Sequence, residues 1–363
     1  MKIAVDGFEI TPDIKGPGRV IDSLLDRLIG ILPEHEFLVM TREYCEKYSE
    51  ARARQYVLPA KSGYFRWQNG PLRRKLNKLK PDLFIASNYT LPLWYDSKSI
   101  LIVHDISVIT HPEWYPKKVA IGRKFLLRRS LKRAGLVVVP SEFTKSEIVS
   151  KLAFPPEKIR VVSLGVDERL RRSSDAEIRK WRESRGLKDR LVIGFLGSIF
   201  RRRNLPALVE AVDKLRTEFP GTILQIIGRD MTYPPQRIGC LLLQDCIRWE
   251  KSLEEQEIPL FYSALDAFAY LSDYEGFGLP PLEALACGTV PVVTATSSLK
   301  EVFQGMAIMV ESADPEEVKL ALKNALMDRN LKESCLGEFA RKREHFSWER
   351  AAGEFASLIR DNA

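Results

Sequence analysis

LVIGFLGSIFRRRNLPALVEAVDKLRTEFPGTILQIIG, residues 191–228, is the stretch that decides the fold class. Leu191–Leu196 and Ile223–Gly228 are short aliphatic runs, as in buried strands, and Asn204–Phe219 between them has its apolar residues at helical spacing. A strand, a helix and a second strand in this order form a βαβ unit, and such units build parallel sheets. The stretch therefore predicts an α/β domain.

The same alternation continues before and after this stretch, so we expect two doubly wound domains. The other expected strands are Lys2–Asp6, Glu36–Met40, Leu83–Ala86, Ile100–His104, Leu136–Pro140, Ile159–Ser163, Ala267–Leu271 and Val290–Val293. The other expected helices are Arg19–Leu28, Lys118–Arg133, Pro281–Cys287, and the segments 314–328, 330–343 and 347–361, the last with Ser347 as its N-cap.

Residues 171–190, RRSSDAEIRKWRESRGLKDR, separate the two series of strands. They are polar and charged without a strand pattern, so we expect a linker there. The domains are then expected at 1–170 and 191–345, as Rossmann-like folds facing each other across a cleft. Residues 346–363 are expected to form a helix that packs back toward the first domain. In such domains, ligands bind at the carboxyl ends of the strands.

Charge is unevenly distributed along the 363 residues. Lys and Arg number 56 against 48 Asp and Glu, a net charge of +8, but residues 1–200 carry +14, and residues 51–133 alone hold 18 basic and 4 acidic side chains. Such a window indicates an anionic partner: nucleic acid, a membrane surface or a polyanionic substrate. A nucleic-acid-binding protein is an alternative reading, although no helix-turn-helix, zinc-finger or RNP-type motif is present.

Other features disfavour several further classes. The cysteines are odd in number and form no Cys-x-x-Cys pair, so we expect them to be reduced, without a disulfide framework or a zinc site; they are Cys45, Cys240, Cys246, Cys287 and Cys335. The first strand is followed by no Gly-x-Gly-x-x-Gly, which disfavours a dinucleotide-binding dehydrogenase. No apolar run is long enough to span a membrane, and Asp6 and Glu9 interrupt the start, so we expect a cytoplasmic protein without a signal peptide.

The strongest chemical motif is EGFGLPPLE, Glu275–Glu283, which follows a strand and opens a helix. Gly276 and Gly278 would let the backbone approach a ligand closely, and the N–H groups at the start of a helix attract phosphate. Glu275 lies in the loop and Glu283 about one helical turn later, so the two carboxylates could contact different parts of one elongated ligand. The alternative is a turn that merely starts a helix, with both acids solvated.

Three further candidate sites follow strands. Arg201, Arg202, Arg203 and Asn204 stand between a strand and a helix, where guanidinium groups could bind phosphate oxygens, or form a solvated basic turn. A second candidate is the short glycine loop with Gly16 and Gly18, which precedes a helix. His104 and Asp105 end a strand, although a lone His is more often a core residue, and His111 follows in Thr-His-Pro-Glu.

EGFGLPPLEALACGTVPVV closely resembles the Glu-x(7)-Glu signature of the retaining glycosyltransferases of family 4, which have the two-domain GT-B fold. Further segments resemble the same family in the same order and together cover nearly the whole chain. They are KGPGRVIDSLLDRL, VHDISVITHPEWYP, VPSEFTKSEI, SLGVD, GSIFRRRNLPALVEAV, SSLKEV and FSWERAA.

The resemblance implies a role for each candidate residue. Glu275 would lie beside the transferred sugar, Glu283 would hold the ribose of the nucleotide, and the backbone of Gly276, Phe277, Gly278 and Leu279 would meet the sugar and the diphosphate. The loop of Gly16 and Gly18 would face the donor, His104 would lie near the reacting sugar, and Asp105 and His111 would lie on the acceptor side.

The basic turn departs from the family pattern. Arg202 aligns with the family's Arg, Arg203 replaces its Lys beside Asn204, and Ser198 stands where many relatives have another Arg. The resemblance implies that Ser198 and Asn204 bind the donor. Which of Arg201, Arg202 and Arg203 contacts the diphosphate is therefore open.

The resemblance implies transfer with retention of anomeric configuration, by front-face attack and without an enzyme nucleophile. The chain contains no Asp-x-Asp motif, so we expect neither a metal nor another cofactor. HDISVITHPEWYP looks most like bacterial mannosyltransferases of surface-polysaccharide assembly. The expected donor is therefore GDP-mannose, with UDP-hexoses as the alternative and an epimerase or phosphorylase of the same fold as a further one.

The acceptor implied by the resemblance is a saccharide or lipid-linked saccharide. A lipid-linked acceptor would bring the basic first domain to an anionic membrane, and we expect peripheral docking there through 61–80 and 117–133.

Overall fold

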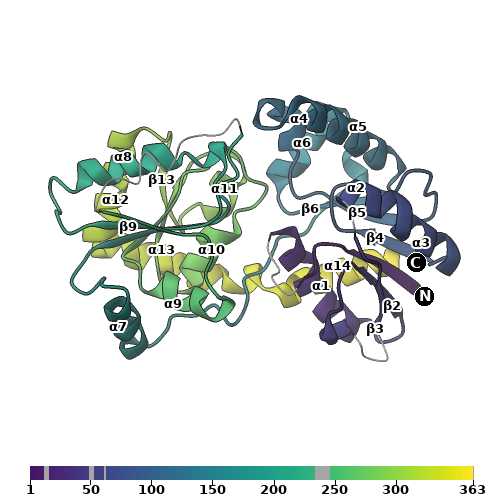
Figure 1. The fold of residues 1–363 in the computed structure, drawn as a ribbon, viewed down its shortest axis with the longest axis horizontal. Coiled ribbons are helices and arrows are strands. Elements are labelled where there is room, and N and C mark those ends of the chain that lie inside the picture. Colours follow the sequence, from purple (N-terminus) through teal and green to yellow (C-terminus); the bar gives the residue numbers. More distant parts are fainter. Residues whose placement is uncertain (12–15, 49–52, 61–62, 234–245, 363) are drawn as a thin grey trace. The chain divides into compact units, whose positions relative to one another are not determined.

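The computed structural model describes residues 1–11, 16–48, 53–60, 63–233 and 246–362, so Cys240 and residues 61–62 of the expected docking segment lie outside the described residues. The chain divides into two compact units (Figure 1). Unit 1 comprises Met1–Pro112, Lys117–Gly165 and His345–Ala363, and unit 2 comprises Glu113–Pro116 and Val166–Glu344.

Unit 1 is built on a seven-stranded parallel sheet in the order β3-β2-β1-β4-β5-β6-β7. Its strands are β1 (Lys2–Gly7), β2 (Glu36–Thr41), β3 (Ala53–Val57), β4 (Leu83–Ala86), β5 (Ser99–Ile102), β6 (Leu136–Val139) and β7 (Ile159–Val161). Its helices are α1 (Pro17–Ile31), α2 (Tyr64–Trp67), α3 (Arg73–Leu79), α4 (Ser107–Thr110), α5 (Lys117–Arg133), α6 (Glu142–Leu152) and α14 (Trp348–Asp361). The order reverses between β1 and β4, because the chain builds outward first on one side of β1 and then on the other.

Unit 2 repeats this plan with a six-stranded sheet in the order β10-β9-β8-β11-β12-β13, also parallel throughout. Its strands are β8 (Val192–Leu196), β9 (Ile223–Ile227), β10 (Ile247–Glu250), β11 (Ala267–Tyr270), β12 (Pro291–Thr294) and β13 (Ile308–Val310). Its helices are α7 (Asp175–Ser184), α8 (Leu205–Leu215), α9 (Ile258–Ser263), α10 (Leu279–Ala286), α11 (Ser297–Phe303), α12 (Pro315–Met327) and α13 (Arg329–Lys342). The prediction of two doubly wound α/β domains is confirmed.

The segment 171–190 differs from the expected linker, because α7 occupies half of it and groups with unit 2. The helix begins with a capping box: the Ser174 hydroxyl accepts from the Glu177 N–H, and the Glu177 carboxylate accepts from the Ser174 N–H. Ile178 and Trp181 on one face of α7 are buried. A polar sequence therefore forms a helix here because a strong cap and two large apolar residues suffice.

The helix α14 groups with unit 1 although it follows unit 2 in the sequence. Arg27 of α1 forms an ion pair with Glu349 of α14, and a Cβ on Gly165 would overlap the backbone of Trp348. The expected cap is confirmed, since the Ser347 hydroxyl accepts from the Arg350 N–H. Among the helices of the described residues, none combines the length and apolar character that crossing a membrane requires.

Candidate active site

The candidate site of unit 2 lies at the carboxyl edge of its sheet, where the strand order reverses. β8 lies between β9 and β11, so the loops after β8 and β11 leave the sheet side by side, next to the loop after β12. In open α/β sheets, such a switch point is where ligands bind. The loop after β8 carries Arg201–Arg203, and the loop after β11 carries Glu275.

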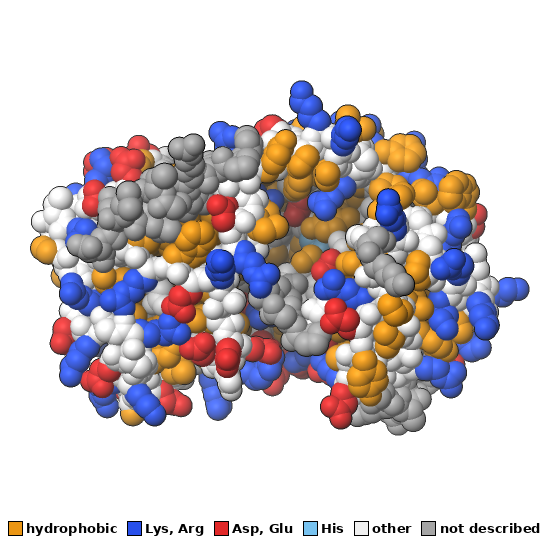
Figure 2. Space-filling model, viewed as in Figure 1, with side chains coloured by type: hydrophobic (Ala, Val, Ile, Leu, Met, Phe, Trp, Pro, Cys, Tyr) orange, Lys and Arg blue, Asp and Glu red, His pale blue; other side chains and the backbone are white. Residues whose placement is uncertain are grey.

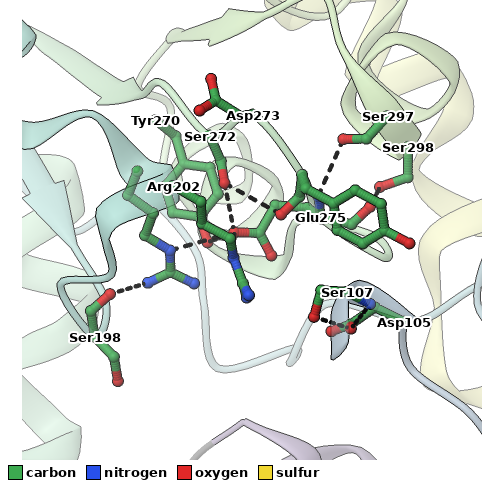
Figure 3. A network of polar contacts seen from close by, with 12 residues as sticks. Asp105, Ser107, Ser198, Arg202, Tyr270, Ser272, Asp273, Glu275, Ser297 and Ser298 are labelled. Carbon is green, nitrogen blue, oxygen red and sulfur yellow. Dashed lines mark hydrogen bonds and ion pairs between the residues drawn. The ribbon is translucent and has the colours of Figure 1, made fainter. Parts of the chain in front are cut away.

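Glu275 is the centre of a network of polar contacts (Figure 3). Its Oε1 accepts hydrogen bonds from the Tyr270 hydroxyl at 3.0 Å, the Ser272 hydroxyl at 2.9 Å and Nε of Arg203 at 3.2 Å. Nε of Arg202 lies 4.0 Å from the same oxygen. The glutamate is 9% exposed, and two guanidinium groups offset the cost of burying its charge.

The backbone of Glu275 also forms hydrogen bonds, to two serine side chains. Its N–H donates to the Ser297 hydroxyl at 3.0 Å, and its carbonyl accepts from the Ser298 hydroxyl at 2.8 Å. Thr294 and Thr296 both donate from their hydroxyls to the Ser272 carbonyl. Ser297 has a φ of 49°, a conformation that costs energy for a residue other than glycine. The loop after β12 therefore fixes the loop that carries Glu275.

The three arginines of the basic turn have different surroundings. Arg201 is exposed, Arg202 is partly buried, and Arg203 is 9% exposed. The Arg203 guanidinium donates to the Ser198 carbonyl at 2.6 Å and lies over the rings of Tyr270 and Phe200. The Arg202 guanidinium also lies over Phe200, with Cζ 4.9 Å from the ring centroid.

Ser198 and Asn204, which were expected to bind the donor, have internal roles in the structure. The Ser198 carbonyl accepts from Arg203, while the residue itself is exposed. The Asn204 side-chain amide donates to the Leu271 carbonyl at 3.1 Å and to the Asp273 carboxylate at 2.6 Å. Asn204 thereby ties the loop after β8 to the loop after β11.

The segment Gly276–Leu279 leads into α10. Gly278 is the N-cap with a φ of 103°, and a Cβ there would lie 2.7 Å from Cδ2 of Leu299, so only glycine fits. Pro280 and Pro281 follow, at positions whose N–H would be unsatisfied in any helix. Gly276 and the Phe277 side chain are buried, and Leu279 is partly exposed.

Glu283 lies in α10 and is 4% exposed. Its Oε2 accepts a hydrogen bond from the Tyr262 hydroxyl at 2.8 Å. The two glutamates of the motif therefore have different surroundings, one among arginines and the other beside a tyrosine. Burial also raises the pKa of the neighbouring Cys287 thiol to about 12, with Glu283 adding to the effect.

In unit 1 the carboxyl ends of β1, β4 and β5 bring together a second group of polar residues. Nε2 of His104 lies 3.1 Å from the Ser87 carbonyl, which can only accept, so Nε2 carries the proton and Nδ1 is the acceptor of the neutral ring. Burial lowers the pKa of His104, while the Ser87 carbonyl and Asp105 partly oppose this. The imidazole is therefore neutral at physiological pH.

Asp105 lies just before α4, and both of its carboxylate oxygens accept hydrogen bonds. Its Oδ1 accepts from the N–H and the hydroxyl of Ser107, at 2.8 and 2.6 Å, and its Oδ2 accepts from the Tyr89 hydroxyl at 3.3 Å. His111 ends α4 and is partly buried. Gly16 is the N-cap of α1 and Gly18 lies buried in its first turn.

Asp6, at the end of β1, is fully buried. Its Oδ2 accepts from the Tyr64 hydroxyl at 2.6 Å and its Oδ1 from the Phe8 N–H at 3.0 Å. These bonds favour the charged form, but burial outweighs them and raises the pKa of Asp6 from 3.8 to about 6.

The structure thus brings Glu275, Arg202, Arg203, Ser198 and Asn204 together in unit 2, and His104 and Asp105 together in unit 1. The motifs gave no indication of the hydroxyl groups that surround the two glutamates, which come from Tyr262, Tyr270, Ser272, Ser297 and Ser298. Within the residues that the structure describes, no three His, Cys, Asp or Glu side chains form a group that could hold a metal ion.

Comparison with known proteins assigns each half of the chain to a family. Residues 14–170 match the model of Glycosyltransferase Family 4, and residues 177–343 match that of Glycosyl transferases group 1. The chain is similar to O-antigen chain mannosyltransferase B of Escherichia coli, with 27% identity over 278 residues, 76% of this chain and 73% of that protein. It is also 24% identical over 285 residues to the serotype-specific mannosyltransferase WbdA of Escherichia coli, of which it spans only about a third (34%).

Solved structures show the same fold over nearly the full length. Sucrose-phosphate synthase of Thermosynechococcus elongatus superposes with a TM-score of 0.79 at 18% identity, over 99% of this chain and 98% of that one. Anabaena HepE, solved in complex with UDP and glucose, gives a TM-score of 0.77 at 17% identity, over 99% of this chain and 100% of that one. The fold is GT-B, and the chain belongs to the glycosyltransferases in which a Family 4 domain is followed by a group 1 domain.

Proposed function

We propose that this glycosyltransferase moves a hexose, mannose from GDP-mannose in the first instance, to a saccharide or lipid-linked saccharide in cell-surface polysaccharide biosynthesis. The observation that carries the proposal is the position of Glu275 between two arginines at the switch point of unit 2. The choice of mannose is supported by the relatives named as O-antigen chain and serotype-specific mannosyltransferases.

Each part of the donor has a partner in this proposal. Glu275 accepts hydrogen bonds from hydroxyls of the transferred sugar, and Glu283 accepts from the ribose, because carboxylate oxygens bind vicinal hydroxyls well. The N–H groups of Gly278 and Leu279 at the start of α10, together with Arg202, stabilise the charge that develops on the leaving diphosphate. His104 accepts a hydrogen bond from the sugar through Nδ1, and the loop of Gly16 and Gly18 faces the donor.

The proposed reaction proceeds with retention and without a resident metal. The diphosphate leaves as the acceptor hydroxyl attacks the same face of the sugar, and a phosphate oxygen takes the acceptor proton. The fixed cation at this step is Arg202, which lies beside Glu275. No covalent bond to Glu275 is formed, and Asp105 and His111 contribute to the acceptor side.

A donor screen tests this function. We expect GDP-mannose to stabilise the protein in a thermal-shift assay and to be consumed with an acceptor, and the product to keep the anomeric configuration of the donor by NMR. UDP-hexoses and ADP-hexoses are the comparison set, and preferential use of a UDP-hexose would replace mannose transfer. The absence of any response to sugar nucleotides would refute the proposal. If the protein then bound nucleic acid, a nucleic-acid-binding protein would be favoured instead.

Two substitutions separate the roles of the glutamates. Glu275→Ala should abolish transfer while donor affinity changes less, because Glu275 is proposed to act on the sugar. Glu283→Ala should mainly raise the Kd of the nucleotide. Full turnover in the Glu275 variant would remove this residue from the mechanism.

We further propose that unit 1 docks on an anionic membrane through 117–133 and the described part of 61–80. On α5, Ile121 is 71% and Phe125 is 64% exposed, and the exposed Lys117, Lys118, Arg123, Arg128 and Lys132 surround them. Figure 2 shows basic and apolar side chains intermixed over this part of the molecule. Apolar residues that enter the interface beside cations that meet lipid phosphates are typical of peripheral helices.

The loop before β5 extends this surface. Trp94 is 69% exposed, and the Arg73 guanidinium of α3 lies over its ring with Cζ 5.4 Å from the centroid. The Asn69 side chain accepts from the Leu93 N–H at 2.6 Å, which fixes the loop to the helical segment. Trp94 and Phe65 thus offer further apolar contacts beside basic side chains.

Liposome co-sedimentation tests the docking. We expect binding to vesicles that contain anionic lipid, weakened by salt and by Phe125→Ser, because both apolar insertion and charge contribute. Leu320→Ser is the matched control, since Leu320 is 59% exposed on α12 of unit 2. Binding that ignores salt, anionic lipid content and Phe125→Ser would refute this surface.

A further inference from the structure

All side-chain donors that reach Glu275 in the described residues end on one of its two oxygens. The hydroxyls of Tyr270 and Ser272 and Nε of Arg203 bond to Oε1, and Nε of Arg202 lies nearest to the same oxygen. Figure 3 shows the dashed contacts converging on this atom. A carboxylate oxygen with three donors is saturated, whereas Oε2 keeps its lone pairs for another partner.

The residues that donate these hydrogen bonds to Oε1 are themselves fixed by burial and by close packing. Tyr270, the last residue of β11, is 1% exposed, and Ser272, two residues later, is fully buried. The Arg203 guanidinium lies against Gly197, where a Cβ would come 2.4 Å from its Nη1. Only glycine at this position therefore leaves room for Arg203 to reach both the Ser198 carbonyl and Glu275.

We propose that Tyr270, Ser272 and Arg203 are positioning residues, and we call them the Glu275 clamp. By holding Oε1, they present Oε2 in one orientation to a hydroxyl of the transferred sugar. This inference rests on the proposed function. It also assigns different roles to two arginines of the basic turn. Arg203 positions Glu275, and Arg202 contacts the diphosphate.

The clamp has a chemical purpose beyond rigidity. Hydrogen bonds from neutral hydroxyls favour the ionised carboxylate without neutralising it. An ionised and fixed Oε2 accepts a strong hydrogen bond from the sugar as positive charge develops at the anomeric carbon, and it needs no reorganisation during the reaction. Removing one of the hydrogen bonds to Oε1 should therefore lower kcat more than it weakens binding of the sugar nucleotide.

Tyr270→Phe and Ser272→Ala test the clamp, because each removes one hydroxyl without adding bulk. With the sugar nucleotide that wild type uses, we expect kcat to fall about tenfold to a hundredfold, as a lost bond to a charged group implies, with the donor KM within about twofold. Thr222→Val is the control: its buried hydroxyl precedes β9, at the amino edge of the same sheet, and donates to the Phe219 carbonyl.

Arg203 is tested by a graded pair. Arg203→Lys keeps a charge near Oε1, whereas Arg203→Met removes it, so the lysine variant should recover part of the lost kcat. Equal activity of the two variants would refute a role for Arg203 through Glu275.

The carboxyl ¹³C signal of Glu275, assigned by its loss in Glu275→Gln, gives a readout without substrate. We expect its chemical shift at neutral pH to change in Tyr270→Phe and Ser272→Ala, each of which removes a hydrogen bond to Oε1, but not in Thr222→Val. An unchanged ¹³C signal of Glu275 in both variants, or a rise in the KM of the sugar nucleotide at constant kcat, would overturn the clamp. If wild type turned over no sugar nucleotide, the proposed function would fail, while the ¹³C signal would still decide whether Tyr270 and Ser272 hold the Glu275 carboxylate.

Discussion

Asp6 should make unit 1 less stable as the pH rises through the weakly acidic range. The carboxyl is fully buried at the end of β1, and its pKa is raised from 3.8 to about 6. The rise is about 2 pH units, and each unit corresponds to about 1.4 kcal/mol. Ionised Asp6 therefore lowers the free energy of unfolding by about 3 kcal/mol relative to the protonated form.

The sign follows from proton binding. Between pH 3.8 and about 6 the folded chain holds the Asp6 proton while the unfolded chain releases it, so the stability that this proton contributes is lost as the pH rises. Below this window both states are protonated, and above it both are ionised. The contribution of Asp6 is thus complete well below pH 3.8 and absent near pH 7.

Asp6→Asn isolates this contribution, because the amide cannot ionise. Its oxygen can still accept from the Phe8 N–H, and its NH₂ can donate to the Tyr64 oxygen. Relative to wild type, the variant should gain about 2–2.5 kcal/mol of unfolding free energy between pH 4 and pH 7, because part of the full effect is already lost at pH 4. Hydrogen exchange of peptides from β1 and β4 measures this within unit 1.

The control is Asp26→Asn, in which an exposed carboxylate of α1 is removed. It should give only a small offset, because this carboxylate is exposed. An Asp6→Asn offset equal at pH 4 and pH 7 would refute the argument, since it would mean that burial does not hold a proton on Asp6.

Three further predictions concern individual residues. Gly278→Ala should lower the unfolding free energy of unit 2 by about 1–3 kcal/mol because of its positive φ. Gly337→Ala within α13, where a Cβ has open space around it, should raise this free energy by about 0.5–1 kcal/mol. Urea unfolding that ranks the two variants in the opposite order would contradict this. Ser347→Ala should cost about 1 kcal/mol through the lost cap, seen as faster hydrogen exchange in α14 and absent in Ser357→Ala within the same helix. Burial keeps His104 neutral, so its NMR titration midpoint should lie below 6.5, with Nε2 protonated; a midpoint at or above 6.5 would refute this.

The sequence allowed most of the central strands to be predicted, because buried parallel strands are continuous apolar runs. The strand β4, Leu83–Ala86, has the bounds that the sequence predicts. The strand Ala53–Val57 was not expected, since ARQYV mixes polar and apolar residues, as an edge strand paired only with β2 can. The helix α7 was missed for a related reason, because its capping box is a local signal within a polar composition.

Only those residues of the candidate site that belong to sequence motifs could be predicted. Glu275 and Arg202 stand in recognisable patterns, and the parallel sheet brings their loops together. Tyr270 and Ser272 belong to no motif, and they matter only because their hydroxyls point at an oxygen that arrives from further along the chain. Contacts of this kind depend on the direction of side chains at the end of one strand, which spacing alone does not specify.

The position of α14 has a consequence for synthesis on the ribosome. This helix covers α1 with Ala351, Phe355 and other buried residues, yet it is made after the whole of unit 2. Unit 2 is nearly continuous in sequence and can close its own core first. Until α14 emerges, the part of α1 that it covers stays exposed, although α1 can already pack on the sheet. The first half of the chain to be translated is therefore the last to be completed.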